Sequence, residues 1–441
     1  MNFDRMRALL LEHAIQGKLV PQLDDEPDVE QIGKTREEVP FDIPKKWKWL
    51  PLKVVCKDFL VPIRDKPTFS NNQMDTPWCR IEDIVEGKYL RGSKSARFLS
   101  EKTIQDMNLK VNPVGTVISA CSASIGAAAV VETQCCTNQT FIGLVCDEQH
   151  LFNWYLYFVL KSAKQRLVDI GTGTTIKYIS RKKYEEFLIP VPSLSEQRRI
   201  VAKLEESFAE IDRAEKAYEE LQSFSGVLRG QILQKAIQGK LVPQLAEEGV
   251  VEQIGVAPEE VPFDIPESWK WIRLKAISSA ISDGSHNPPP NAGKGIPVLS
   301  AKNVFDGQVH IETANRWVTL EQWELEDQKI HIEKRDVLLT IVGTIGRTAV
   351  VEEDDRFMLQ RSVSVIKPRS EIVDSYFLSI MLNAPLMLKW MLDRAAGTAQ
   401  KGVYLRTLKE MPIPVPPLDE QKRIVTKVEG LLKQVDALSK R

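Results

Sequence analysis

Several residue patterns in this chain are close to motifs that carry chemistry, and each lacks a part that its reaction needs. Residues 287–290 read Asn-Pro-Pro-Pro, which is near the Asn-Pro-Pro-aromatic motif of adenine methyltransferases, where the aromatic ring stacks on a flipped base. Pro290 stands in place of that aromatic residue. Gly-Lys pairs at 17–18 and 239–240 lack the first glycine and the Ser or Thr of a phosphate-binding loop. Gly171–Gly173 is a lone Gly-x-Gly after an expected helix. We interpret these segments as loops and turns, and we expect a non-catalytic chain.

The histidines and cysteines do not form a metal or catalytic set either. His286 lies in a polar loop, Asp283–Asn287, and His13 corresponds to Lys235 in the internal repeat described below. The cysteines include no Cys-x-x-Cys pair and no His at ligand spacing, so we expect no metal site and no bound cofactor. They are Cys56, Cys79, Cys121, Cys135, Cys136 and Cys146, and their counterparts in the repeat are Ser278, Leu299, Ile341, Asp355, Arg356 and Lys367. A fold shared by both copies cannot depend on them, and we interpret them as reduced thiols.

The sequence contains an internal repeat, in which the second half of the chain repeats segments of the first. Residues 14–23 and 236–245 both read AIQGKLVPQL, and the same offset of 222 residues relates VEQIG, EEVPFDIP and WKW in the two halves. Further on, IPVPSLSEQRRIVAKLE (189–205) matches IPVPPLDEQKRIVTKVE (413–429) at an offset of 224. Each half therefore has near-identical ends and a divergent middle. Such a repeat predicts two lobes that share a fold and are attached to the rest of the chain in the same way. The divergent middles predict that the functional surfaces of the two lobes differ.

The two chain ends together spell out one further copy of the central segment. With the offset continued, Arg441 aligns with Ala217 and Met1 aligns with Ser223, so only residues 218–222 of the central segment are unmatched. If the two ends of the chain were joined, the sequence would be close to two complete copies of one unit. We therefore expect a pseudo-two-fold object whose termini meet.

Long helices are the elements that must position the two working surfaces. Residues 195–239 carry apolar residues at spacings of three, four and seven, which predicts one helix, about 65 Å long if Ser223–Gly226 does not interrupt it. The matching helix is assembled from residues 419–441 and 2–17. We expect the two helices to form an antiparallel, coiled-coil-like pair between the lobes. The alternative is that each helix packs only on its own lobe.

The lobes themselves are expected to be mixed α/β. The Trp-Lys-Trp segments alternate like a strand end, and we interpret them as core packing. Each lobe shows a strand, a Gly-containing turn and a second strand, then a helix and a Gly-Thr loop. The strand pairs are predicted at 116–131 and 336–351, the helices at 151–170 and 375–395, and the loops at 171–180 and 397–406.

Length, composition and charge bound the class of protein. With 441 residues, 43% hydrophobic and 27% charged, the chain fits a globular protein of two to three domains. It shows no apolar run near the ~20 residues that span a membrane and no export signal, so we expect a cytoplasmic protein without a membrane partner. The net charge of −1 hides a segregation, because residues 23–44 carry −6 and residues 246–268 carry −7, which leaves +12 elsewhere. This distribution is compatible with a DNA footprint.

Taken together, these motifs resemble the specificity subunit of type I restriction-modification systems, over essentially the whole chain. The resemblance is carried by FDIP followed by Trp-x-Trp at the start of each lobe, by Pro-Val-Pro and Glu-Gln-(Arg/Lys)-Arg-Ile-Val at its end, and by Ile-Gln-Gly-Lys-Leu-Val-Pro beyond. It implies two target-recognition domains, each reading one half of a bipartite, asymmetric site in double-stranded DNA. It also implies that the chain docks two modification (methyltransferase) subunits, which restriction subunits join. S-adenosylmethionine, ATP and Mg are then expected on those partner subunits.

The resemblance also implies a division of the chain. The expected segments are the N-terminal half of a composite distal helix (1–22), a first target-recognition domain (23–194), a central helical spacer (195–245), a second target-recognition domain (246–418) and the C-terminal half of the distal helix (419–441).

Each lobe should offer Arg and Lys to phosphates and guanine, and Asn and Gln to adenine. The candidates in the first lobe are Arg64, Lys66, Arg91, Lys94, Arg97, Gln139, Thr174, Thr175, Lys177 and Tyr178. Those in the second lobe are Ser285, His286, Asn287, Lys302, Asn303, Arg347, Arg361, Thr398, Gln400 and Lys401.

Two other functions stay open at this point. One is a DNA-free scaffold that organises two copies of an enzyme, and the other is an enzyme in its own right. The charge of the lobes discriminates only weakly, because residues 51–192 hold 18 Lys and Arg against 14 Asp and Glu, and residues 273–416 hold 18 against 17.

Overall fold

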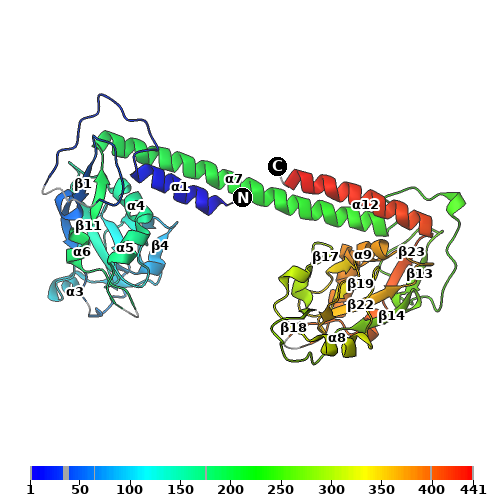
Figure 1. Ribbon diagram of the computed structural model, residues 1–441. Coiled ribbons are helices and arrows are strands. Elements are labelled where there is room, and N and C mark those ends of the chain that lie inside the picture. Colours follow the sequence, from blue (N-terminus) through cyan, green and yellow to red (C-terminus); the bar gives the residue numbers. More distant parts are fainter. Residues whose placement is uncertain (1, 33–38, 64, 174–175, 398–399, 440–441) are drawn as a thin grey trace. The chain divides into compact units, whose positions relative to one another are not determined.

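The computed structural model describes residues 2–32, 39–63, 65–173, 176–397 and 400–439, and Figure 1 shows their helices and strands. The chain divides into two compact units, Met1–Ala217 and Tyr218–Arg441, which match the two halves of the repeat. We call residues 48–191 of the first unit the first lobe and residues 270–415 of the second unit the second lobe. Within the described part of the chain, no helix is both long and apolar enough to cross a membrane.

The first unit is a mixed α/β lobe mounted on helices. Its helices are α1 (Phe3–Ile15), α2 (Leu52–Val55), α3 (Glu101–Asp106), α4 (Asn153–Ser162), α5 (Lys164–Ile170), α6 (Arg181–Glu185) and the first part of α7 (Leu194–Ile237). Its strands are β1 (Lys48–Pro51), β2 (Cys56–Leu60), β3 (Thr76–Cys79), β4 (Ile84–Val85), β5 (Tyr89–Leu90), β6 (Phe98–Leu99), β7 (Val111–Asn112), β8 (Val117–Ala120), β9 (Ala128–Val131), β10 (Cys135–Thr137), β11 (Phe141–Cys146) and β12 (Leu188–Val191).

Three sheets organise the first lobe. A six-stranded sheet has the order β2-β11-β8-β9-β5-β4, and a four-stranded sheet has the order β6-β3-β10-β7. Strand β8 is buried at every position because it lies between β9 and β11 and under α4. Strands β1 and β12 pair antiparallel, so the chain enters and leaves the lobe side by side.

The second unit repeats this plan. Its helices are the second part of α7, α8 (Leu320–Asp327), α9 (Ser375–Asn383), α10 (Pro385–Asp393), α11 (Leu405–Lys409) and α12 (Leu418–Ser439). Its strands are β13 (Lys270–Arg273), β14 (Ser278–Asp283), β15 (Ile296–Leu299), β16 (Val304–Phe305), β17 (Gln308–Val309), β18 (Trp317–Val318), β19 (Val337–Thr340), β20 (Thr348–Val350), β21 (Met358–Leu359), β22 (Val363–Pro368) and β23 (Pro412–Val415).

The strand order of the second lobe corresponds to that of the first. The order β14-β22-β19-β20 matches β2-β11-β8-β9, and β18-β15-β21 matches β6-β3-β10, including one parallel pair in each. The entry and exit strands, β13 and β23, again pair antiparallel. Both predicted strand-turn-strand segments are therefore found, as β8 with β9 and as β19 with β20.

Sheet register corrects three of the cysteine counterparts. Cys136 pairs with Trp78 where Met358 pairs with Val298, so Cys135 and Cys136 correspond to Phe357 and Met358, not to Asp355 and Arg356. Cys146 lies opposite Cys56 where Pro368 lies opposite Ser278, so its counterpart is Pro368, not Lys367. The corrected counterparts, Phe357, Met358 and Pro368, are apolar, which fits the burial of Cys135, Cys136 and Cys146.

Two predicted helices are each broken in two. Residues 151–170 divide at Ala163 into α4 and α5, and residues 375–395 divide at Ala384 into α9 and α10. Ala384 has ψ 142° because the ring of Pro385 disfavours the helical conformation of the residue before it.

Helix α7 runs through Ser223–Gly226 without interruption. In the first unit α1 lies antiparallel along the first part of α7, and in the second unit α12 lies antiparallel along the second part (Figure 1). Each terminal helix is thus paired with the part of α7 that belongs to its own unit.

Candidate functional site

The start of helix α7 (193–199) meets two other segments of the first unit (17–26 and 44–47), and we call the three together the first junction. The hydroxyl of Ser193 accepts a hydrogen bond from the N–H of Glu196 at 3.2 Å, which caps the helix. Gln197 donates to the carbonyls of His150 and Pro192 at 2.8 and 2.9 Å and accepts from the N–H of Phe152 at 2.7 Å. The side chain of Gln197 therefore joins the start of the helix to the lobe at His150 and Phe152.

A buried glutamate lies at the centre of the first junction. Glu196 is 2% exposed and accepts hydrogen bonds from the indole of Trp47 at 2.9 Å and from the amide of Gln22. Burial raises the pKa of Glu196, and these two hydrogen bonds oppose the shift. The first Trp of the Trp-Lys-Trp segment is thus a core residue whose polar atom has a specific partner.

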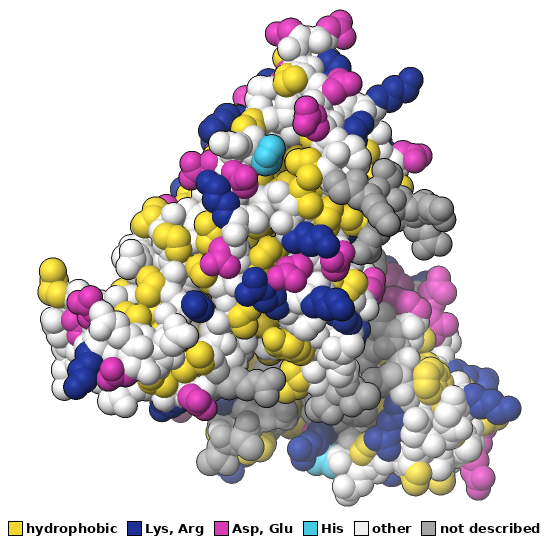
Figure 2. Space-filling view, turned by 90° about the vertical axis from the view of Figure 1, so that its left-hand side faces the viewer, with side chains coloured by type: hydrophobic (Ala, Val, Ile, Leu, Met, Phe, Trp, Pro, Cys, Tyr) yellow, Lys and Arg dark blue, Asp and Glu magenta, His cyan; other side chains and the backbone are white. Residues whose placement is uncertain are grey.

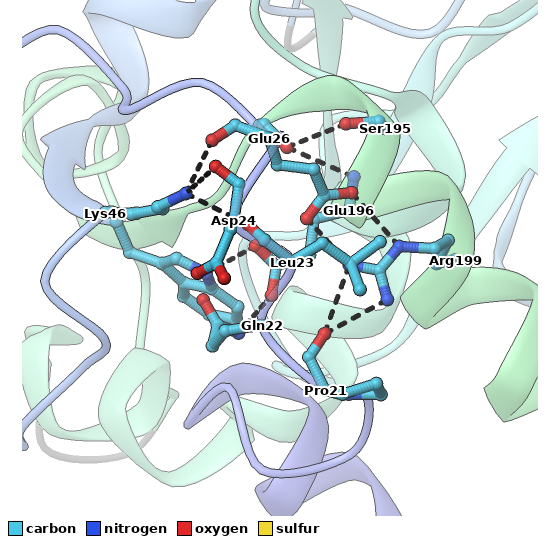
Figure 3. A network of polar contacts seen from close by, with 11 residues as sticks. Pro21, Gln22, Leu23, Asp24, Glu26, Lys46, Ser195, Glu196 and Arg199 are labelled. Carbon is cyan, nitrogen blue, oxygen red and sulfur yellow. Dashed lines mark hydrogen bonds and ion pairs between the residues drawn. The ribbon is translucent and has the colours of Figure 1, made fainter.

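An ion pair lies beside that glutamate (Figure 3). The guanidinium of Arg199 is 2.7 Å from the carboxylate of Glu26 and donates to the carbonyl of Pro21 at 3.2 Å. The hydrogen bond from Arg199 lowers the pKa of Glu26. Lys46 donates to the carbonyls of Leu23, Asp24 and Glu26. These contacts fold the segment after α1 back onto the start of α7.

The second unit repeats the same contacts at its second junction (residues 239–248, 266–269 and 417–423). Trp269 donates to Glu420 at 3.0 Å, and Gln244 donates to the other oxygen of Glu420 at 2.9 Å. Arg423 pairs with Glu248 at 2.5 Å and donates to Pro243 at 3.0 Å. The Trp–Glu, Gln–Glu, Arg–Glu and Arg–carbonyl contacts therefore recur at both junctions. The contacts of Lys46 and Ser193 belong to the first junction alone, because their counterparts are Ser268 and Pro417.

Each junction contains one position that only glycine can occupy, which explains why glycine recurs in both halves of the repeat. Gly17 has φ +71°, and a Cβ atom there would lie 2.3 Å from the ring of Pro44. Gly239 has φ +66°, and its Cβ atom would lie 2.4 Å from the ring of Pro266. Only glycine tolerates both the left-handed conformation and the proline contact, so each Gly-Lys pair is a helix-ending turn.

The helix pairs carry equivalent ion pairs as well. Arg7 of α1 contacts Asp212 of α7 at 2.6 Å, and Arg229 of α7 contacts Asp436 of α12. In the repeat Arg7 corresponds to Arg229 and Asp212 to Asp436. Helix α1 therefore contacts the first part of α7 through the same ion pair by which the second part of α7 contacts α12.

The divergent lobes bring their hairpin turn and Gly-Thr loop together. In the first lobe a bridge joins Ser122 to Tyr178, and in the second lobe a bridge joins Val342 to Gly402. Gln139 and Tyr178 line a shared cavity of about 410 Å³. The N–H of Gly343 donates to the carbonyl of Lys401 at 3.3 Å. These loops expose several of the predicted residues at one end of each lobe.

The structure divides the first-lobe candidates into two groups. Gln139, Lys177 and Tyr178 are exposed and lie with the Gly-Thr loop. The others lie around the four-stranded sheet and the β4–β5 hairpin, against aromatic rings or carboxylates: Lys66 at Phe69, Arg91 with Glu86, Glu132 and Tyr89, Lys94 at the carbonyl of Ile84, and Arg97 with Glu82 and Trp78. Arg64, Thr174 and Thr175 lie outside the described residues.

The second-lobe candidates also divide. Arg361 is exposed and its N–H donates to the carbonyl of Ser285 at 3.1 Å, which places these two together. The remaining exposed candidates are His286, hydrogen-bonded to Asp283 at 2.8 Å, with Asn287, Lys302, Arg347, Gln400 and Lys401. Thr398 lies outside the described residues.

Asn303 is a correction to the candidate set. It is 6% exposed, its side-chain oxygen accepts from the N–H of Ser300 at 2.9 Å, and its amide donates to Thr313 at 2.9 Å. An amide that is buried and bonded in this way holds a turn and is not free to meet a base edge.

Sequence reasoning missed three basic residues near the Gly-Thr loop of the first lobe. Lys161 and Lys164 line a cavity of about 750 Å³ together with Lys177. Arg181 lines the neighbouring cavity with Gln139. The spacing of Lys161 and Lys164 was visible, but only the fold shows that the turn 123–127 faces them.

Among the residues that the structure describes, no group of three or more His, Cys, Asp or Glu side chains is placed to hold a metal ion. Comparison with known proteins identifies the family to which the chain belongs. The family described as type I restriction modification DNA specificity domain matches residues 44–223 and again residues 266–441. This chain belongs to the type I restriction-modification specificity subunits.

Relatives and solved structures agree with this assignment. The chain is 24% identical over 375 residues to the EcoBI specificity subunit of Escherichia coli, covering 84% of this chain and 76% of that protein. It is 23% identical over 403 residues to the MjaVIII specificity subunit of Methanocaldococcus jannaschii, covering 88% and 87%.

Two solved structures have a similar fold. The crystal structure of the HsdS subunit from Thermoanaerobacter tengcongensis has a TM-score of 0.55 at 20% identity, covering 91% of this chain and 93% of that one. A chain solved for complex assembly and conformational transition of the type I R-M system has a TM-score of 0.66 at 22% identity, covering 91% and 94%.

The surface charge of this specificity subunit is mixed. In the view of Figure 2, Lys and Arg side chains are interspersed with Asp and Glu. Recognition of a polyanion by such a surface depends on local groups of cations placed by the fold.

Proposed function

We propose that this specificity subunit reads a bipartite, asymmetric site in duplex DNA, one half-site with each lobe, and docks two methyltransferase subunits at its two junctions. The observation that carries the proposal is the contrast between the repeated junctions and the divergent loops. Equivalent junctions suit two copies of one partner. Different loops suit two different half-sites.

The docking part of the proposal is supported by a groove beside the second junction. Leu241, Val242 and Pro243 line a cavity of about 620 Å³ against Thr426 and Gly430 of α12. Leu19, Val20 and Pro21 repeat the same three residues at the first junction. A half-buried apolar segment rimmed by charged residues such as Lys422 is typical of a protein–protein contact.

The DNA-reading part is supported by the exposed polar groups at one end of each lobe. Lys and Arg can contact phosphates or guanine, and Gln can contact adenine. In the first lobe Gln139, Lys177 and Tyr178 are so placed, and in the second lobe Arg361, Gln400 and Lys401 are so placed. The chain supplies binding and spacing, and its partner subunits supply S-adenosylmethionine, ATP and Mg for the chemistry.

Mapping of methylated adenines in cells that co-express the chain with its modification subunit tests the proposal. We expect a split motif whose two halves differ in sequence and are separated by unread positions. A single continuous motif, or methylation that does not depend on the chain, would contradict bipartite reading. Retention of the assembled complex on duplex DNA, weakening with added salt, separates a DNA reader from a DNA-free scaffold.

A further inference from the structure

The first lobe contains a cavity of about 750 Å³ beside its Gly-Thr loop. Its floor is the hairpin turn at 123–127 between β8 and β9, and its walls come from the end of α4, from α5 and from the loop at 176–177. Its charged lining residues are Lys161, Lys164 and Lys177. The cavity therefore presents positive charge alone.

The fold holds these lysines in place. The side-chain stem of Lys164 lies against Gly126, where a Cβ atom would be 2.3 Å from Cγ of the lysine. Gly126 has φ +94°, so this position needs glycine for both its conformation and the lysine contact. The ammonium of Lys177 donates to the carbonyl of Val168 at 3.1 Å, which ties the loop to α5.

The cations of the cavity have no acidic counterpart. Within the described residues, no ion pair joins Lys161, Lys164 or Lys177 to a carboxylate. Burial, with the charge of Lys164 as a further cause, lowers the pKa of Lys161. A half-buried ammonium beside a second ammonium is destabilised until an anion joins it.

The second lobe has a different chemistry at the corresponding place. There Gly346 lies against Leu388 and Met391. Asn383 corresponds to Lys161 at the offset of 222, and its amide donates to the carbonyl of Ser379 at 2.9 Å. Shared folding therefore does not require Lys161 and Lys164, which are particular to the first lobe, whereas Lys177 has a counterpart in Lys401 of the second lobe.

We propose that the cavity lined by Lys161, Lys164 and Lys177 binds a phosphate group of the DNA backbone at the half-site read by the first lobe. This inference rests on the proposed function. A phosphodiester supplies the missing negative charge and accepts hydrogen bonds from several ammonium groups at once. The cavity adjoins Tyr178 of the Gly-Thr loop, so a backbone that passes that loop passes the cavity. A free phosphate ion has the same chemistry and is the other source to be distinguished.

The test compares salt dependence of duplex binding for the full assembled complex. The variant Lys161→Met with Lys164→Met is measured against wild type by fluorescence anisotropy on a random-sequence duplex, over a range of salt concentrations. Loss of one or two phosphate contacts should make the slope of log Kobs against log salt shallower by about 1 to 2. The matched control is Lys102→Met with Lys110→Met, which removes the same charge from exposed positions of the same lobe, and its slope should stay close to that of wild type.

Each outcome decides between stated alternatives. An unchanged slope in the cavity variant, with wild type binding normally, overturns this inference and leaves the proposed function in place. Wild type that shows no salt-dependent binding overturns both. The single variant Lys164→Gln, at an exposed side chain, repeats the test if the double variant does not fold, and should show the smaller part of the same change. Binding of inorganic phosphate to wild type but not to the cavity variant at low millimolar concentration, with no change in duplex affinity, would assign the cavity to a free anion and overturn this inference.

Discussion

At the scale of single residues, the ion pair of the first junction should make stability depend on pH. Because Arg199 lowers the pKa of Glu26 below 4.5, the unfolded chain takes up a proton on this carboxyl at a higher pH than the folded chain does. The stabilisation is therefore complete above about pH 4.5 and is lost as the pH falls through the lowered folded value.

We expect the free energy of unfolding of wild type to fall more steeply below about pH 4.5 than that of Glu26→Gln, by urea denaturation at several pH values. Glu196, whose pKa is raised mainly by burial, is present in both proteins, so the burial part of its opposite contribution cancels in the comparison; the charge of Glu26 adds a smaller raising effect that the variant removes. Glu148→Gln, at an exposed carboxyl, serves as control and should follow wild type. Equal slopes for wild type and Glu26→Gln would contradict the assignment.

A second prediction at this scale concerns base reading. Gln400 and Lys401 are exposed at the Gly-Thr loop of the second lobe. Replacing both by alanine should weaken recognition of one half-site by about 1–3 kcal/mol and leave the other half-site intact. Gln139→Ala in the first lobe, at an exposed amide, should affect the other half-site. Probes mutated in one half at a time give the readout. If the double variant binds every probe like wild type, this loop does not contact DNA.

The hydrogen-bond partners of single residues could not be predicted from the sequence. The burial of Trp47 and Trp269 was predicted from the Trp-Lys-Trp pattern, but their glutamate partners lie about 150 residues away and carry no local signal. Asn303 was chosen for its amide, which the fold uses to hold a turn. A polar residue in a loop looks the same in sequence whether its partner is a base or a backbone group.

At the scale of elements, hydrophobic periodicity predicted α7 and both strand-turn-strand pairs, because these elements are long or fully buried. It did not predict the breaks at Ala163 and Ala384, since the apolar pattern continues across both. Sequence alignment through the divergent middle also placed Cys146 one residue from its true counterpart, where only strand pairing fixes the register.

The continuity of α7 gives a prediction for its glycines. Gly226 lies in an exposed part of the helix, and a Cβ atom there meets nothing within 4 Å. Gly226→Ala should therefore raise the free energy of unfolding by about 0.5–1 kcal/mol, because alanine loses less backbone entropy in a helix. Gly230 is the matched control, since its Cβ atom would lie 3.3 Å from the ring of Pro385, and Gly230→Ala should gain less. Thermal unfolding followed by circular dichroism measures both. A less stable Gly226→Ala protein would argue against a regular helix at this point.

At the scale of the whole molecule, two equivalent junctions should hold two copies of one partner. Light scattering of the co-expressed complex should give two modification subunits for each copy of this chain. Thr426 is exposed in the groove of the second junction, and Ala202 is its exposed counterpart at the first. Thr426→Trp should fill the groove of the second junction and leave a one-to-one complex. Ala202→Trp should block docking at the corresponding position of the first junction, and the double variant should bind no partner. A wild-type complex with a single modification subunit would exclude two equivalent docking sites.

The circular arrangement of the repeat gives the most stringent test at the scale of the whole molecule. A fragment of residues 1–222 carries α1, the first lobe and the first part of α7, and Met1 aligns with Ser223, the residue that would come next. Helix α1 holds the first part of α7 through Arg7 and Asp212 as the second part of α7 holds α12 through Arg229 and Asp436. The fragment therefore contains one copy of every repeated element.

Two fragments should then associate with true two-fold symmetry, each supplying what the missing half supplied. Such a dimer presents the first lobe twice in inverted orientation, so its target should become a palindrome built from the half-site of the first lobe. Co-expression of the fragment with the modification subunit, followed by mapping of methylated adenines, should yield that palindrome at a spacing near that of the parent site. A fragment that folds but stays monomeric, or one that still directs methylation to the asymmetric parent site, would show that the two halves of the chain are not interchangeable.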